Sequence, residues 1–120
     1  MTDLIDEPED YCPADFAVMA ILSTRKRPQS KSAIMRDCIQ KYGDLIEHGP
    51  YIYGEYSDDI DEAIEGLCSE GILRREKEGT AYRISLTEYG VDLFNRFLHT
   101  PIEDDDLEAM KDAILGRWAE

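Results

Sequence analysis

The chain has 120 residues, of which 42% are hydrophobic, and this is enough for one domain with a single modest core. Its formal net charge of −14 at pH 7 favours solubility and disfavours nonspecific binding to phosphate. No apolar run approaches the roughly 20 residues that span a bilayer, and the N-terminus lacks the basic and apolar regions of a signal peptide. We therefore expect a cytoplasmic protein with no membrane partner.

The negative charge is unevenly distributed along the chain. Residues 1–24 carry −6, residues 42–73 carry −9 and residues 84–120 carry −6. The two intervening segments are basic, since residues 25–41 carry +5 and residues 74–83 carry +2. Because surface charges act over about 8 to 10 Å at ordinary salt, these two basic segments can attract a partner that the total charge repels.

The N-terminal residues predict an acidic tail followed by a central helix. Residues 1–12 are acidic and show little periodicity, so we expect a flexible tail. Pro13 suits the first turn of a helix, because the backbone N–H that it lacks would have no helical partner there. Residues 16–22 read FAVMAIL and are apolar almost all round, so this helix should lie in the core.

A second helix is expected after a basic turn. Ser30 or Ser32 can cap it, and Gly43 can end it in the left-handed conformation that glycine permits. Its apolar positions recur at helical spacing and are Ile34, Met35, Cys38, Ile39 and Tyr42. The following linker, residues 44–56, contains tyrosines among glycines and a proline, and it predicts an ordered loop with a short strand at residues 51–53.

A third helix is expected to begin after Ser57, which is a good N-cap. Gly71 would close this helix, with Ile72 packing back in a Schellman arrangement. Its buried face comprises Ile60, Ala63, Ile64, Leu67 and Cys68. Its solvent-facing positions include only acids among the charged residues, namely Asp58, Asp59, Asp61, Glu62 and Glu65.

A hairpin and a fourth helix follow. Residues 73–77 and residues 81–86 can pair across a turn around Glu78 and Gly79. One face of the second strand would carry Tyr82, Ile84 and Leu86. Thr87 then caps a helix whose inward-facing residues are predicted to be Val91, Phe94, Phe97 and Leu98.

Residues 100–120 predict a final helix. Thr100 and Glu103 form a capping box, and Pro101 suits the first helical position. One apolar stripe runs along this helix and consists of Leu107, Met110, Ile114 and Trp118. Such a stripe either folds back on the domain or is buried against another chain, and we expect it to form the interface of a homodimer.

The order helix, helix, helix, hairpin, helix resembles the winged helix-turn-helix superfamily of bacterial, archaeal and viral transcription regulators. The motifs that carry the resemblance are EGIL at residues 70–73 and the junction ISLTEYG at residues 84–90. The resemblance implies a mainly α fold with a small β-hairpin (α+β), a winged helix-turn-helix with an additional C-terminal helix. The expected organisation is a tail (1–12), a winged-helix domain (13–99) and a C-terminal helix (100–120).

In this family the third helix normally enters the major groove of DNA. The present chain departs from the pattern, because carboxylates near phosphate add repulsion where a DNA reader gains affinity. If DNA is bound, the contacts are expected from the two basic segments: Arg25, Lys26, Arg27, Lys31, Arg36, Lys41, Arg74, Arg75, Lys77 and Arg83. The same charges can instead form surface ion pairs, each contributing about 0 to 1 kcal/mol to stability.

Two functions are therefore compatible with the sequence. The first is a transcriptional regulator that binds double-stranded DNA through the wing and the basic region of the first two helices. The alternative is an acidic winged-helix interaction module that does not bind DNA and meets a basic protein partner, as a DNA mimic or a viral or prophage protein.

No catalytic or metal-binding motif is apparent. His48 and His99 are isolated, and the sequence has no phosphate-binding glycine loop or nucleophile elbow. The cysteines lack the paired spacing of a metal site, and core packing is the expected role of Cys38 and Cys68, which fall on apolar helix faces. We expect no enzymatic activity, no cofactor and no metal.

Overall fold

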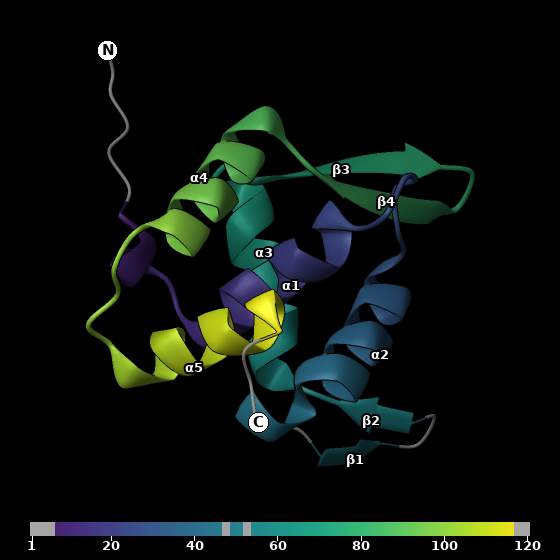
Figure 1. Cartoon of the computed structure of the whole chain (residues 1–120). Coiled ribbons are helices and arrows are strands. Elements are labelled where there is room, and N and C mark those ends of the chain that lie inside the picture. The colour runs from purple at the N-terminus through teal and green to yellow at the C-terminus, as the bar shows by residue number, and fades with distance from the viewer. Residues whose placement is uncertain (1–6, 47–48, 52–53, 117–120) are drawn as a thin grey trace.

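The computed structural model describes residues 7–46, 49–51 and 54–116 (Figure 1). The predicted mainly α fold with a small β-hairpin is confirmed. In chain order the helices and strands of the described residues are η1 (Pro8–Asp10), α1 (Pro13–Ser23), α2 (Lys31–Tyr42), η2 (Gly43–Leu45), β1 (Gly49–Tyr51), β2 (Gly54–Tyr56), α3 (Asp58–Ser69), β3 (Leu73–Glu78), β4 (Ala81–Leu86), α4 (Glu88–His99) and α5 (Asp105–Leu115).

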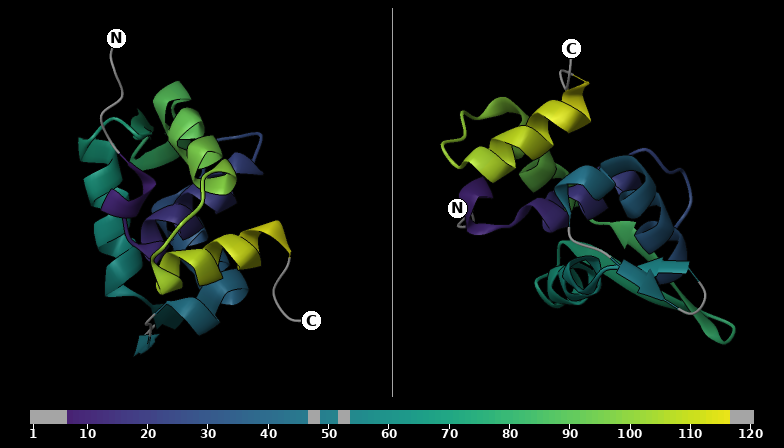
Figure 2. Two further views of the ribbon diagram at one scale, coloured as in Figure 1. Left: turned by 60° about the vertical axis from the view of Figure 1, so that its left-hand side comes forward. Right: turned by 90° about the horizontal axis from the view of Figure 1, so that it is seen from below.

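Helix α1 is the centre of the core. It contacts α2, α3, α4 and α5, and these helices surround it in Figure 2. Every residue from 16 to 22 is buried, as the apolar run predicts. The ring of Phe16 stacks on that of Phe97 in α4, with 3.8 Å between the ring centroids and 6° between the ring planes. The first and fourth helices are therefore joined by the largest fully buried side chains of the core.

Part of the predicted flexible tail is folded against the domain. Pro8 is buried, and Asp10 accepts a hydrogen bond from the backbone N–H of Glu7, which closes the short turn η1. The Tyr11 hydroxyl donates to the Glu70 carboxylate at 3.0 Å. Residues 7–12 thus belong to the folded domain, whereas residues 1–6 lie outside the described part of the chain.

The caps of α2 and α3 follow the sequence closely, with one exception. Ser30 accepts a hydrogen bond from the Ala33 backbone and Ser57 from the Ile60 backbone, so both serines are N-caps. Gly71 has a φ of 81°, and the Ile72 N–H donates to the Leu67 carbonyl at 3.0 Å, which is the predicted Schellman closure. Gly43 differs, because its φ is −61° and the chain continues into η2.

The linker between α2 and α3 forms a hairpin rather than a loop with one strand. Strands β1 and β2 pair antiparallel, with Gly49 opposite Tyr56 and Tyr51 opposite Gly54. The strand predicted at residues 51–53 is therefore corrected to two strands, and residues 52 and 53 lie outside the described ranges. Strand β2 lies against α2, at the other end of the molecule from β3 and β4 (Figure 1).

Strands β3 and β4 form the second hairpin, which projects from the helices (Figure 1). Leu73 pairs with Leu86 and Glu78 with Ala81, so the turn consists of Gly79 and Thr80, one residue later than predicted. Gly79 has a φ of 68°, which a residue with a side chain rarely adopts. Ile84 is buried, whereas Tyr82, on the same face, is 52% exposed because it lies towards the projecting tip.

The junction between the hairpin and α4 explains the second sequence motif. The Thr87 hydroxyl oxygen accepts from the Gly90 N–H at 3.1 Å and lies within hydrogen-bond distance of the carbonyls of Gly71 and Ile72. Gly90 packs so closely on Ile72 that it leaves no room for a side chain. The threonine and the glycine of this motif thus tie the end of α3 to the start of α4.

The predicted inward face of α4 is wrong at one position. Phe94 and Phe97 are buried as expected, and Leu98 is half-buried. Val91 is 43% exposed, and Leu93 takes its place in the core. The spacing of Leu93, Phe94 and Phe97 is helical, so the period was predicted correctly and only one edge of the buried face was misplaced.

Helix α5 folds back onto its own chain. It contacts α1 and α4, and Leu107 and Met110 are fully buried in the core. Its N-cap is Asp104, which accepts from the N–H groups of Asp106 and Leu107, so the predicted capping box at residues 100–103 is wrong. The stripe predicted to form a dimer interface is corrected accordingly: Leu107 and Met110 are core residues, Ile114 is half-buried and Trp118 lies outside the described residues.

Candidate nucleic-acid interface

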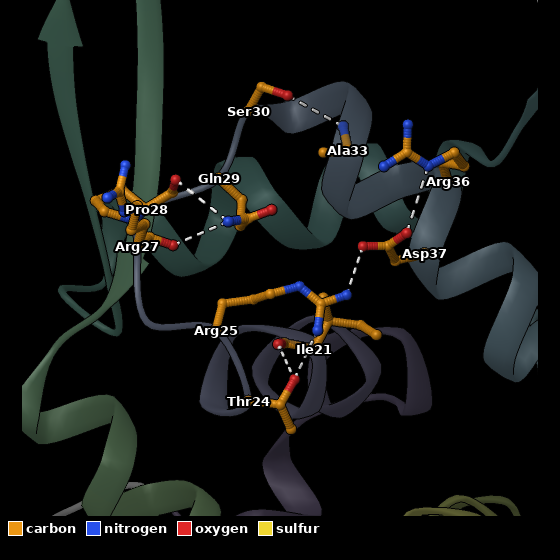
Figure 3. Close-up of polar contacts among 10 residues, drawn as sticks. All are labelled: Ile21, Thr24, Arg25, Arg27, Pro28, Gln29, Ser30, Ala33, Arg36 and Asp37. Carbon is orange, nitrogen blue, oxygen red and sulfur yellow. Dashed lines mark hydrogen bonds and ion pairs between the residues drawn. The ribbon is translucent and has the colours of Figure 1, made fainter.

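The basic turn between α1 and α2 is held by hydrogen bonds that engage part of its charge (Figure 3). Arg25 donates to Asp37 at 2.7 Å and to the Thr24 hydroxyl at 2.9 Å. Arg36 donates to the other oxygen of Asp37 at 3.4 Å. Burial disfavours ionisation of Asp37, but the hydrogen bonds from the two arginines outweigh it and lower the pKa of this carboxyl. Arg25 and Arg36 are therefore partnered within the chain.

The next residues of the turn pair with the edge of β4. The Gln29 N–H donates to the Ile84 carbonyl at 2.9 Å, and the Ile84 N–H donates to the Gln29 carbonyl at 2.8 Å. The Gln29 side chain donates to the Arg27 carbonyl at 3.0 Å and fixes the preceding bend (Figure 3). This backbone bridge places Arg27 beside the projecting hairpin and brings the two basic segments of the sequence together.

A polar cleft of about 410 Å³ lies where the turn meets the hairpin. Its lining comprises Arg27, Pro28, Gln29, Glu76, Lys77, Glu78 and Arg83. Arg83 pairs with Glu78 at 3.0 Å. Within the described part of the chain, no ion pair holds Arg27 or Lys77. We call Arg27, Lys77 and Arg83 the basic strip. Its first two members have no ion pair in the described residues, although the Lys77 ammonium lies 6.0 Å from the centre of the Tyr82 ring.

Two other predicted DNA contacts are neutralised by α3. Lys31 contacts Asp61 and donates to Glu65 Oε2 at 2.8 Å, and Arg75 donates to the same oxygen at 2.7 Å. We call these four residues the Glu65 cluster. It joins α2, α3 and β3, and its two cations and two anions cancel. Acids of α3 and cations of the two basic segments, which lie far apart in the sequence, thus form ion pairs with one another.

The Glu65 cluster gives the protein a pH-dependent contribution to stability. Hydrogen bonds from Arg75 and Lys31 lower the pKa of Glu65 from 4.5 to about 2. Because the folded-state pKa is depressed, the contribution is present above pH 4.5 and is lost as the pH falls towards 2. Glu65 is 49% exposed, so solvent screening limits it to about 1 kcal/mol or less.

We expect the stability difference between the native protein and Glu65→Gln to shrink as the pH falls from 6 to 2.5, since below pH 4.5 the unfolded native chain takes up a proton at Glu65 that the folded protein does not. Urea midpoints of both proteins across this range measure it. Glu62→Gln, on the same helix without a described ion pair, is the control and should show no comparable change. A difference that stays constant with pH would contradict the prediction.

The remaining predicted site residues lie at separate places. Asp58, Asp59 and Glu62 are exposed on α3, and the described residues show no ion pair to them. Lys26 and Arg74 are exposed, and neither lines the cleft. Lys41 lies in the last turn of α2, beside the Tyr42 ring and at the opposite end of this helix from the strip. It is therefore not part of the same surface.

Solved structures with this arrangement establish the fold. A transcriptional regulator of the MarR family from Silicibacter pomeroyi matches with a TM-score of 0.56 and 19% sequence identity, over 92% of this chain and 61% of that one. SSV1 F-93 matches with a TM-score of 0.51 and 17% identity, over 98% of this chain and 96% of its own. The chain has the winged helix-turn-helix fold. No protein-family model and no curated protein sequence matches it.

In this fold, the hairpin β3–β4 is the wing, and α3 is the helix that precedes it. The sequence does not predict the pairing of Gln29, because a single paired residue between a proline and a serine produces no alternating pattern. The cations of the two basic segments also look alike in the sequence. The structure separates them into the basic strip, the Glu65 cluster, the Asp37 pair and isolated residues such as Lys41.

None of the described helices is long and apolar enough to cross a bilayer. The described residues also contain no group of three or more histidine, cysteine or acidic side chains placed to hold a metal ion. Cys38 is buried in the core and Cys68 is half-buried, in agreement with the packing role expected of them, whereas Cys12 is exposed at the start of α1.

Proposed function

We propose that this winged-helix protein is a transcriptional regulator that binds double-stranded DNA, with its phosphate contacts made by the wing and the α1–α2 turn. The observation that carries the proposal is the bridge between Gln29 and Ile84, which holds Arg27 beside the cations of the wing. The MarR-family neighbour is described as a transcriptional regulator, which supports the same class for this chain.

Helix α3 has a limited role in this proposal. The exposed carboxylates of Asp58, Asp59 and Glu62 lie in its first half, which would otherwise enter the major groove. Each of them adds repulsion near phosphate and removes part of the affinity that cations supply. We therefore assign positioning contacts to the basic strip and no base reading to α3.

The second candidate function is a protein-interaction module whose acidic α3 meets a basic protein surface. Its specific support is that Asp58, Asp59 and Glu62 are exposed and have no ion pair among the described residues, which leaves the solvent-facing side of this helix negative. The two candidates make opposite predictions for duplex DNA at low salt, where phosphate contacts are strongest.

The basic strip can be tested by removing the charges of its two unpaired members. In Arg27→Gln/Lys77→Gln we expect weaker binding to duplex DNA. The slope of log Kobs against log salt concentration should also be shallower by about 1.8, since each phosphate contact contributes about 0.9. Fluorescence anisotropy of a labelled duplex, titrated from about 50 to 200 mM salt, measures both quantities.

The control is Lys41→Gln, which removes one charge at the far end of α2 and should leave the slope unchanged. Equal slopes for the native protein and the double variant would place the contact elsewhere. Absence of binding by the native protein at about 50 mM salt would reject the DNA-binding function and favour the protein-interaction module.

Homodimerisation and a cytoplasmic location stay predictions. Because Leu107 and Met110 are buried within their own chain, a dimer would require another surface. The exposed large hydrophobic residues in the described ranges are Tyr82, Val91 and Leu115. Light scattering on the native protein measures the mass directly, and a monomeric mass would reject the dimer.

A further inference from the structure

One carboxylate oxygen in the Glu65 cluster is shared by two cations from different elements. Glu65 Oε2 lies 2.8 Å from Lys31 Nζ of α2 and 2.7 Å from an Arg75 guanidinium nitrogen of β3. An ammonium and a guanidinium that converge on one anionic oxygen are also the groups that proteins use to hold a phosphate oxygen. The two cations are therefore arranged for an anion, and Glu65 supplies it.

We propose that Lys31 and Arg75 form a binding site for a DNA backbone phosphate, which the Glu65 carboxylate occupies in the free protein. This inference rests on the proposed function and assigns a regulatory role to an acid of α3. A phosphate enters only when it displaces the carboxylate, so the affinity for DNA is set by a competition between an internal and an external anion.

The surroundings of the site allow this exchange. The side chain of Glu65 is 49% exposed, so it can rotate into solvent without leaving a buried charge. Arg75 does not depend on Glu65 alone for its position, because its guanidinium lies 5.8 Å from the centre of the Tyr82 ring on the same face of the wing. Lys31 keeps Asp61 as a second partner. Loss of the Glu65 contact would therefore remove the carboxylate partner of Arg75, while Lys31 would stay paired with Asp61.

The matched pair Glu65→Gln and Glu62→Gln separates this exchange from simple repulsion. Both variants remove one carboxylate from the exposed side of α3, but only the first releases an arginine. We expect Glu65→Gln to bind duplex DNA about tenfold more tightly than Glu62→Gln at about 0.1 M salt, with a salt slope steeper by about 0.9, the value for one added phosphate contact.

Two further variants test whether the gain comes from the released cations. In an Arg75→Gln background, the advantage of Glu65→Gln over Glu62→Gln should disappear. Adding Asp61→Asn to Glu65→Gln should free Lys31 as well and steepen the slope by about a further 0.9. Circular dichroism of each variant verifies that the fold is retained.

The outcomes distinguish this inference from the proposed function. If the native protein binds duplex DNA but Glu65→Gln and Glu62→Gln bind equally, the phosphate site is wrong and the DNA-binding function stands. If no variant binds DNA, a titration of Glu65→Gln with inorganic phosphate tests the phosphate site, and binding is followed through the backbone amide signal of Arg75. A saturable shift that Arg75→Gln/Glu65→Gln lacks supports the site without DNA, and no shift overturns it.

Discussion

Replacement of Gly90 by alanine is expected to lower the free energy of unfolding by about 3 kcal/mol or more. A Cβ atom at this position would collide with the Ile72 carbonyl oxygen and would lie 2.8 Å from Cδ1 of Leu86. The carbonyl cannot move away without cost, because it accepts hydrogen bonds from the backbone N–H of Thr87 at 3.1 Å and from its hydroxyl at 2.9 Å. Relief of the clash would break the junction between β3 and α4.

Gly66→Ala is the matched control for this substitution. Gly66 lies within α3, and a Cβ atom there would meet no atom within 4 Å. Alanine should therefore stabilise the protein by about 0.5 to 1 kcal/mol, the helix propensity that glycine lacks. Urea unfolding followed by circular dichroism measures both variants. An unfolding midpoint of Gly90→Ala equal to that of the native protein would show that the close packing on Ile72 is absent.

Leu107→Asp is expected to destabilise the protein by about 4 kcal/mol or more, enough to unfold a domain of ordinary stability. Leu107 is 1% exposed and packs in the core on the side of α1 that α5 covers. The substitution removes apolar contacts and also places a carboxylate in a site without a hydrogen-bonding partner. The side chain would ionise only if α5 detached from the domain.

Leu115→Asp, on the same helix, provides the comparison. Leu115 is 42% exposed, so its replacement should change stability by about 0.5 kcal/mol or less. Thermal unfolding and light scattering of both variants separate a core residue from an interface residue. A folded Leu107→Asp protein with a native melting temperature and a halved mass would show that α5 packs against a second chain instead.

The local features of the fold were accessible from sequence because they depend on neighbouring residues. Ser30, Ser57 and Thr87 cap their helices through hydrogen bonds to backbone groups three residues away. Gly71 closes α3 for a similar reason, since its backbone needs a positive φ. The fold family followed from these signals, because the order of helices and strands and the motifs at their junctions are local.

Other features depended on contacts between distant segments and were not accessible. The burial of Leu93 in place of Val91 is decided by how α4 lies on α1, which helical spacing alone does not determine. The fold-back of α5 likewise depends on the surface that α1 offers to Leu107 and Met110.

The candidate site shows the same limit more clearly. All five acids of α3 were predicted to face solvent, and their local pattern is the same. Glu65 nevertheless meets Lys31, 34 residues earlier in the chain, and Arg75 on the wing. Which acid has a basic partner depends on the packing of α2 and β3 around α3, so sequence could identify the charges but not pair them.

The bridge between Gln29 and Ile84 limits how the chain can vary in length. The turn between α1 and Gln29 is only five residues long, and the Gln29 side chain holds its bend by a hydrogen bond to the Arg27 carbonyl. A residue inserted there would disturb this bend and move Arg27 relative to the cleft. The wing tip at Gly79 and Thr80 has no such third partner, and extra residues there would leave the rest of the hairpin in register. In related chains, insertions at the wing tip would therefore preserve the surface formed by the turn and the wing, whereas insertions in the turn between α1 and α2 would not.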